Sequence, residues 1–295
     1  MQSFNEYAPL RRVGLRRPEE AFRSEARIAA QWQDLGWRGA PDFKAAVREY
    51  DAFVGALTDS GAEAVFLAGD DGLSLDSLYV RDTAIATKKG VVICRLGKEA
   101  RRPEGPQTGH GLEAAGIALA GAVENKGRLE GGDFVWLADQ TAAVGLTYRS
   151  NSDGVWQLKA LLGDGSEELI VIDLPHYKGP DDVFHLMSIL SPLDKDLALV
   201  FSPLMPISFR RRLLSLGIKL VEAAEEEFET KGCNVLALGP RRCLAVDGNP
   251  ETRRRLEQAG CEVLVYAGEE ITQKGDGGPT CLTLPLLRGT NDSRG

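Results

Sequence analysis

The sequence predicts an α/β protein in which one strand–turn–strand–helix unit repeats around a closed ring. Apolar segments return in pairs about short polar turns, and helix-like stretches follow several of these pairs. The units begin about 50–70 residues apart, which is a period typical of stacked supersecondary units. No Gly/Ser-rich or Pro-rich tract divides the chain, so we expect residues 1–295 to form a single domain. Because the units include helices, an α/β ring is favoured over an all-β propeller.

The predicted elements begin with a polar leader over residues 1–9 and a strand over Arg11–Arg17 that ends at Pro18. Helical periodicity follows over Glu19–Leu57, with a break around Gly39–Pro41. Four hairpins are expected next, at Ser77–Cys94, Phe134–Leu146, Ser188–Phe201 and Asn234–Val246. Helical connectors are expected at Gly111–Glu124, Pro206–Lys219 and Pro250–Ala259, the last of them capped by Asn249.

The composition excludes several classes of protein. With 35 Lys+Arg against 43 Asp+Glu, the formal net charge is -8, which disfavours nucleic acid or an anionic membrane as the main partner. The apolar runs are too short to span a bilayer, and the N-terminus lacks the features of a signal peptide, so a cytoplasmic location is expected. Five cysteines without a CxxC pair, and three histidines, indicate neither a disulfide framework nor a zinc site.

One cysteine differs from the others in its surroundings. Cys281 ends the glycine-rich segment Gly275-Asp-Gly-Gly-Pro-Thr-Cys281, and a thiol exposed on such a loop is a candidate nucleophile. The remaining cysteines lie in or beside apolar strands and are expected to be buried: Cys94, Cys233, Cys243 and Cys261. His185 directly precedes the third hairpin, where it is either a core residue or an acid–base group. His110 and His176 lie in loop-like segments and are expected at the surface.

Two charged segments stand at the entrances of predicted strands. In Glu130-Gly-Gly-Asp133 the glycines permit close approach of the backbone, which could aim a carboxylate into a pocket; a solvated turn is the alternative. Arg81-Asp82 interrupts apolar sequence and needs partners, either as a buried ion pair or in a site.

Together these segments resemble the guanidine-modifying enzymes of the pentein superfamily, which includes arginine deiminases and dimethylarginine dimethylaminohydrolases. The resemblance extends from about Tyr7 to Arg288 and rests on five segments in the same order. These are Asp76-Ser-Leu-Tyr-Val-Arg-Asp82, Arg101-Arg-Pro-Glu104, Leu129-Glu-Gly-Gly-Asp133, Phe184-His-Leu186 and Gly277-Gly-Pro-Thr-Cys281. The resemblance implies a pentein fold, a five-bladed, pseudo-symmetric α/β propeller, in agreement with the repeating units described above: the first strand and the four hairpins.

The resemblance also implies roles for four residues. Asp82 and Glu130 would accept N–H bonds from a planar guanidinium, and Cys281 would attack its central carbon as a thiolate. His185 would protonate the departing amine and then activate water against the covalent adduct. The products would be a ureido compound such as citrulline and ammonia or an alkylamine, with no metal or organic cofactor.

Three further residues are implied in holding the other end of a substrate. Arg101 and Arg149 are candidates for binding an α-carboxylate, and Asp76 for binding an α-amino group. A solvated surface charge is the alternative interpretation for each of them. If the assignments hold, the partner is a small guanidino amino acid; the oligomeric state is left open.

The sequence leaves the substrate unsettled. Arginine deiminases carry an aspartate two residues after the histidine, and this chain has Met187 at that position. Dimethylarginine hydrolases lack the aspartate as well. Met187 therefore favours a methylated substrate, with apolar surface in place of a carboxylate. Arg81-Asp82 and Gly232-Cys-Asn-Val235 are closer to the deiminases. The alternatives are an amidinotransferase, a citrulline (ureido) hydrolase and a non-catalytic pentein that binds the ribosome.

Overall fold

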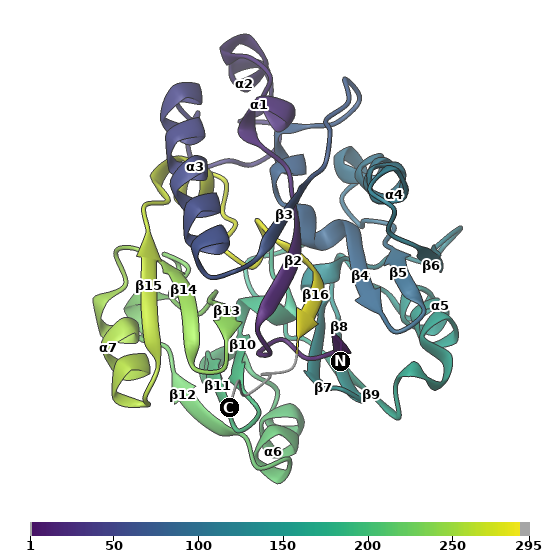
Figure 1. Ribbon diagram of the computed structural model, residues 1–295, viewed down its shortest axis with the longest axis vertical. Helices are drawn as coiled ribbons and strands as arrows, with labels where there is room; N and C mark the ends of the chain where they lie inside the picture. The colour runs from purple at the N-terminus through teal and green to yellow at the C-terminus, as the bar shows by residue number, and fades with distance from the viewer. Residues whose placement is uncertain (1, 290–295) are drawn as a thin grey trace.

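In the computed structural model, which describes residues 2–289, the strands form five small sheets arranged in a ring (Figure 1). Four sheets hold three strands each: β4 (Ala84–Thr87), β5 (Gly90–Ile93) and β6 (Leu119–Ala122); β7 (Phe134–Ala138), β8 (Thr141–Leu146) and β9 (Glu168–Asp173); β10 (Leu190–Asp194), β11 (Leu197–Val200) and β12 (Lys219–Glu222); β13 (Leu236–Gly239), β14 (Arg242–Val246) and β15 (Glu262–Tyr266). The fifth sheet has the order β1 (Gln2–Ser3), β16 (Leu284–Gly289), β2 (Leu10–Leu15), β3 (Glu63–Phe66). The prediction of a five-bladed α/β propeller is confirmed.

Every blade follows the same rule of pairing. Two strands pair antiparallel, and a third strand joins one of them in parallel, as β6 joins β5; in four of the blades the antiparallel pair is a hairpin. A parallel partner requires a crossover connection, and helices supply it. These helices are α3 (Phe43–Asp59), α4 (Glu104–Ala114), α5 (Ser152–Leu162), α6 (Ile207–Ser215) and α7 (Pro250–Gln258), with α1 (Pro18–Ala21) and α2 (Glu25–Gln31) preceding α3.

The fifth blade is assembled from both ends of the described chain. β16 pairs antiparallel with β2, and β1 pairs with the other edge of β16. The prediction of a polar leader over residues 1–9 is therefore wrong in part. Phe4 is buried and packs edge-on against Trp136, with ring centroids 6.0 Å apart, and this contact anchors the segment that follows β1.

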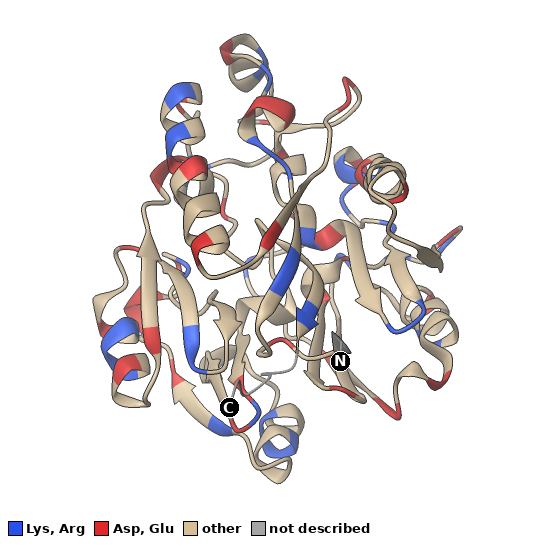
Figure 2. Cartoon of the chain, viewed as in Figure 1, with Lys and Arg blue, Asp and Glu red and all other residues tan. Residues whose placement is uncertain are grey.

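Apolar side chains fill the spaces between the sheets and their helices. All four residues of β11 are buried, as expected for a strand covered on both faces. Figure 2 shows that most charged residues lie on the outer helices and loops, while the strands are largely uncharged. Cys94, Cys233, Cys243 and Cys261 are buried, as predicted. Within residues 2–289, no helix is long and apolar enough to cross a membrane.

Several expectations about local structure differ from what the structure shows. The helix expected over Gly111–Glu124 begins earlier, at Glu104, and the end of that segment forms β6; α5 was not predicted. Asn249 precedes α7, but its side chain bonds to Thr230 instead of capping the helix. The first backbone N–H groups of α7, those of Glu251 and Thr252, donate to the carboxylate of Glu227 at 2.8 and 2.7 Å. A residue distant in sequence thus provides the cap that local sequence indicated for Asn249.

Candidate active site

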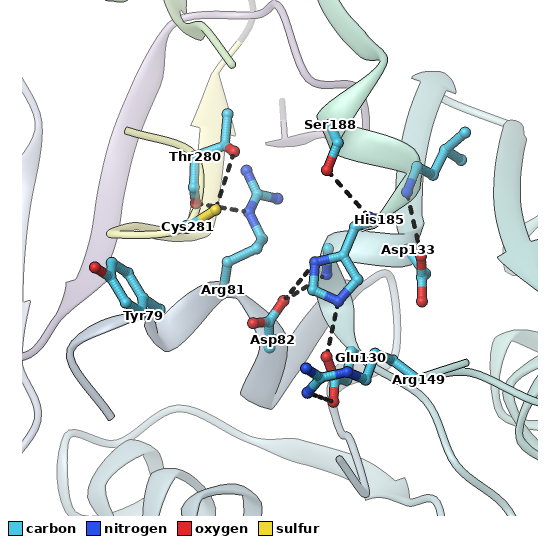
Figure 3. Close-up of polar contacts among 12 residues, drawn as sticks. Tyr79, Arg81, Asp82, Glu130, Asp133, Arg149, His185, Ser188, Thr280 and Cys281 are labelled. Carbon is cyan, nitrogen blue, oxygen red and sulfur yellow. Dashed lines mark hydrogen bonds and ion pairs between the residues drawn. The ribbon is translucent and has the colours of Figure 1, made fainter. Parts of the chain in front are cut away.

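The candidate site residues lie at the entrances of the blades. Short 3₁₀ helices lead into the hairpins, at Val80–Thr83 before β4, Gly131–Asp133 before β7 and Leu186–Ser188 before β10. Asp82, Glu130 and His185 lie in or beside these helices, and Asn234 and Cys281 directly precede β13 and β16. Because each blade enters from the same end of the ring, residues far apart in sequence converge there (Figure 3).

His185 lies between two carboxylates. Its Nε2 is 2.7 Å from Oε2 of Glu130, and its Nδ1 is 3.8 Å from Oδ1 of Asp82. The backbone N–H of Leu186 donates to Asp133 at 3.1 Å, which fixes the chain next to the ring. Burial alone would lower the pKa of His185, but the negative charges of Asp82, Asp133 and Glu130 raise it to about 9. The imidazole therefore carries a proton at neutral pH.

Glu130 holds His185 from the closed side of the site. It is fully buried, and its Oε1 accepts the backbone N–H groups of Gly97 and Lys98 at 2.9 and 3.3 Å. Burial would raise the pKa of Glu130, but the hydrogen bond and charge of His185, with the charge of Arg149, hold it well below its usual range. Glu130 is thus a permanent anion that orients the imidazole.

Asp82 is fixed from both sides. Its Oδ2 accepts a hydrogen bond from Arg101 Nη1 at 2.6 Å, and its Oδ1 accepts the backbone N–H of Gly132 at 3.0 Å. Arg101 also donates to Glu104, at 3.0 and 2.8 Å, and to the carbonyl of Tyr79 at 2.8 Å. A guanidinium with four such bonds serves chiefly to position Asp82.

Two glycines explain the motifs around these groups. A Cβ atom at Gly132 would lie 2.6 Å from Nδ1 of His185 and 2.7 Å from Oδ1 of Asp82. A Cβ atom at Gly278 would lie 2.4 Å from Oδ1 of Asn234. Both glycines are therefore required by close approach, because any side chain would displace a site residue.

The thiol of Cys281 is half-buried and faces the cavity. Asn234 lies beside it: its Nδ2 is 3.8 Å from Sγ, and its Oδ1 accepts hydrogen bonds from the backbone N–H and hydroxyl of Thr280 at 3.1 and 2.9 Å. Burial, followed by the charge of Asp82, raises the pKa of Cys281. A cation placed between Asp82 and Sγ would oppose both effects and favour the thiolate.

A cavity of about 180 Å³ brings the predicted site residues together. Its lining includes Cys281, His185, Asp82, Asp76, Arg101 and Arg149. Glu130 lies behind His185, so its predicted contact with a guanidinium has no counterpart in this geometry. We call Asp82, Glu130, His185 and Cys281 the reaction end.

A second group of charges lines the same cavity. Asp76 accepts a hydrogen bond from the indole N–H of Trp37 at 2.8 Å and another from Nζ of Lys98 at 2.6 Å. Arg149 is almost fully buried, and its Nη1 lies 3.7 Å from Oε1 of Glu130. We call Asp76, Lys98 and Arg149 the tail end.

The sequence interpretation missed several residues of the site. Asn234 belongs to Gly232-Cys-Asn-Val235, whose likeness to deiminases was a usable signal. No signal in the sequence pointed to Lys98, because a lysine near a turn is ordinarily solvated. Met187 packs in a hydrophobic cluster with Leu186 and Ile189, so the expectation that it presents apolar surface to a substrate is not supported.

The side chains of Arg81 and Asp82, although adjacent in sequence, have different partners. Arg81 donates to Glu6 at 3.3 Å and to the carbonyl of Thr280 at 3.2 Å, and so forms the buried ion pair that was one of its two interpretations.

Asp82, Glu130 and His185 each offer one possible metal-ligand atom, all within 4.8 Å of one another. His185 Nε2 is already bonded to Glu130, and the three groups suit proton transfer and cation binding without a metal.

The ring of five blades and the cavity at their entrances define a pentein. The family model described as "N,N dimethylarginine dimethylhydrolase, eukaryotic" matches residues 28–288, and the chain belongs to that family. It is accordingly a hydrolase that acts on the C–N bonds of guanidino groups.

Individual relatives agree with this assignment. The chain is 30% identical over 249 residues to an N(G),N(G)-dimethylarginine dimethylaminohydrolase of Streptomyces coelicolor, covering 83% of this chain and 87% of that protein. It is 28% identical over 243 residues to an arginine deiminase of Mycobacterium avium, covering 72% of this chain and 60% of that protein. Its fold matches the dimethylarginine hydrolase of Pseudomonas aeruginosa in complex with citrulline, with a TM-score of 0.74, 23% identity and coverage of 95% and 99%.

Proposed function

We propose that the protein hydrolyses a guanidino C–N bond of arginine or an N-methylated arginine through a covalent adduct on Cys281. The observation that carries this proposal is that Cys281, His185 and Asp82 line one cavity although they come from different blades. A thiol, a protonated imidazole and a fixed carboxylate around a small cavity are the groups that attack on a guanidinium requires.

The first half of the reaction forms the adduct. Asp82 accepts N–H bonds from the guanidinium and holds its plane against Sγ of Cys281. The bound cation lowers the pKa of the thiol, and the thiolate attacks the central carbon. The bond to one terminal nitrogen then breaks, and His185 gives its proton to that nitrogen, which leaves as ammonia or methylamine.

The second half of the reaction releases the product. Neutral His185, still held by Glu130, takes a proton from water, and the resulting hydroxide adds to the carbon of the adduct. The C–S bond breaks, the thiolate leaves, and a ureido group remains. The net reaction consumes one water and yields citrulline with ammonia or, from a methylated substrate, methylamine or dimethylamine.

The test is a product screen by mass spectrometry. Purified protein is incubated with arginine, monomethylarginine, asymmetric dimethylarginine and citrulline, with Cys281→Ala as the blank. We expect citrulline from at least one of the first three and none from the blank. Ornithine formed from citrulline would replace the proposal with a ureido hydrolase.

Adding glycine to the same screen distinguishes the acceptor. A water-resolved adduct gives the ureido product at an unchanged yield, whereas transfer to glycine gives guanidinoacetate and ornithine. Formation of guanidinoacetate would replace the hydrolase with an amidinotransferase.

A cytoplasmic location remains a prediction, which cell fractionation would test.

A further inference from the structure

Lys98 makes a set of contacts that a substrate's own amino group would need. Its Nζ donates to the backbone carbonyl of Leu35 at 2.7 Å and to Oδ2 of Asp76 at 2.6 Å. The other carboxylate oxygen of Asp76 accepts the indole N–H of Trp37 at 2.8 Å. A carbonyl and a carboxylate that converge on one ammonium form a binding site for an ammonium, and the side chain of Lys98 already fills it.

This arrangement changes what Asp76 can recognise. At 2.6 Å the charge of Lys98 cancels that of Asp76, whose two oxygens both have donors, and Lys98 pairs with no other carboxylate within residues 2–289. Arg101 beside Asp82 differs, because Glu104 shares its charge and leaves a net negative charge for a substrate cation. The α-ammonium of an amino acid at this place would face the ammonium of Lys98, with both oxygens of Asp76 already bonded. Like charges brought together in a mostly buried site are unfavourable. The interpretation of Asp76 as the ligand of an α-amino group is therefore at odds with the geometry.

The same end of the cavity is well suited to an anion. Gly97 lies against Arg149, since a Cβ atom at Gly97 would be 2.4 Å from the carbonyl oxygen of Arg149; the backbone that carries Lys98 thus lies beside this arginine. Arg149 is 5% exposed, and its guanidinium donates no hydrogen bond within residues 2–289; its contact with Glu130 is 3.7 Å long. Lys98 uses two of its three N–H donors on Leu35 and Asp76, which leaves one.

We propose that the tail end selects guanidino acids that carry a carboxylate but no charged α-amino group, because Lys98 occupies the ammonium subsite itself. The proposal rests on the guanidino hydrolysis of the proposed function, and it moves the preferred substrate from arginine to a guanidino acid of the same length without the α-amino group. The matching substrate is δ-guanidinovalerate, which is arginine without its α-amino group. Its guanidinium would meet Asp82, and its carboxylate would meet Arg149 and Lys98. With one water it would give δ-ureidovalerate and ammonium. Arginine makes the same contacts but adds an ammonium opposite Lys98, so it is turned over less efficiently.

The test compares kcat/KM for δ-guanidinovalerate, arginine and agmatine, which is arginine without its carboxylate. We expect δ-guanidinovalerate to exceed arginine by about tenfold or more, because that factor corresponds to only about 1.4 kcal/mol of charge repulsion. We expect the cation agmatine to be the poorest of the three. Arginine or agmatine exceeding δ-guanidinovalerate would overturn this proposal and leave the guanidino hydrolase intact. No turnover of any guanidino compound would overturn both proposals.

Variants of Lys98 identify the cause. Lys98→Ala empties the ammonium subsite, so the preference for δ-guanidinovalerate over arginine should fall by about tenfold or reverse. Lys98→Met keeps the length of the side chain without the charge, and it should lower the same ratio while keeping the fold. Lys44→Ala, at an exposed position of α3, is the matched control and should leave the ratio unchanged. An unchanged ratio in folded Lys98→Met would overturn the proposal.

Discussion

The reaction end and the tail end of the cavity are built in different ways. At the reaction end, backbone N–H groups and glycines fix the side chains, as Gly132 does for Asp82 and Gly278 does for Asn234. At the tail end, long side chains satisfy one another, as Lys98 and Asp76 do. On the proposed function, the backbone mainly places the reacting groups, while side chains that can be exchanged set which substrate fits.

The difference between the reaction end and the tail end can be tested by measuring kcat and KM for variants at each end. Substitutions at the reaction end should lower kcat and leave the preference among guanidino acids unchanged. Substitutions at the tail end should change KM or the preference while much of kcat remains. The predictions below follow this division, beginning with the largest expected effect.

Removal of the thiol should have the largest effect. Cys281→Ala is expected to lower kcat by about four orders of magnitude or more, because without the nucleophile no covalent adduct forms. The measurement is ureido product by mass spectrometry. Cys261→Ala removes a buried thiol far from the chemistry and serves as the control. Activity retained in Cys281→Ala would contradict the assignment of the nucleophile.

Loss of the imidazole should be the next most severe change. His185→Gln is expected to lower kcat by about 10²–10⁴-fold, the usual range for general acid–base groups. With a substrate whose leaving group needs no proton, such as S-methylthiocitrulline, the adduct on Cys281 should accumulate and be visible by intact-protein mass. His176→Gln, at an exposed position, is the control. Normal release from His185→Gln would disprove the role of His185 in the second half-reaction.

The pair of Glu130 and His185 should make stability depend on pH. The folded-state pKa of His185 is raised from 6.5 to about 9, so the stabilisation is fully present below pH 6.5 and is lost as pH rises through 9. Glu130→Gln should lower the free energy of unfolding by about 3–5 kcal/mol at pH 6.5, because it leaves a buried cation with a weaker partner. Urea denaturation should show a smaller difference above pH 9.

A variant of an exposed glutamate shows whether this pH dependence belongs to the pair. Glu113→Gln, on α4, should change the free energy of unfolding little and by the same amount at both pH values. An equal loss for Glu130→Gln below pH 6.5 and above pH 9 would mean that His185 is uncharged when folded.

The smallest effect is expected at the tail end. Arg149→Gln should raise KM for δ-guanidinovalerate by about 10- to 100-fold, the range that loss of a charged hydrogen bond gives, while kcat changes little. Arg149→Lys should recover part of the loss because it keeps the charge without the paired donors. Steady-state kinetics with both variants tests this. A fall in kcat comparable to that of His185→Gln would erase the distinction between the two ends.

The sequence predicted the parts of the molecule that depend on local pattern. The hairpins at Phe134–Leu146 and Asn234–Val246 contain β7–β8 and β13–β14, because alternating apolar strands around short turns have few other solutions. The strand expected after Ser77 fails for a local reason: Leu75–Leu78 and Val80–Thr83 form 3₁₀ turns that carry Asp76 and Asp82 into the cavity. Departures from regular structure were thus found at the site itself.

The remaining errors come from partners far away in the sequence. Glu227 caps α7 in place of Asn249, and Glu6 takes Arg81 out of the site. Lys98 and Asp76 lie on either side of the β4–β5 hairpin, and the hairpin brings them together although 22 residues separate them. Such pairings depend on which elements lie next to each other, and no window of residues around Asn249 or Lys98 contains that information. The residues of the reaction end could be predicted because their motifs resemble those of a family. The pairing of charges at the tail end could not be predicted in this way.

The way the ring closes also sets the order in which the enzyme can become active during its synthesis. β16 completes the blade of β2 and β3, and Cys281 lies just before it. A nascent chain that has released the other four blades holds Asp82, Glu130 and His185 but has no nucleophile between them. The thiol reaches the cavity in the same step that closes the ring. If Cys281 is the nucleophile, as proposed, the protein passes from inert to competent in one late event, and an incomplete chain presents no assembled reactive cysteine to the cell.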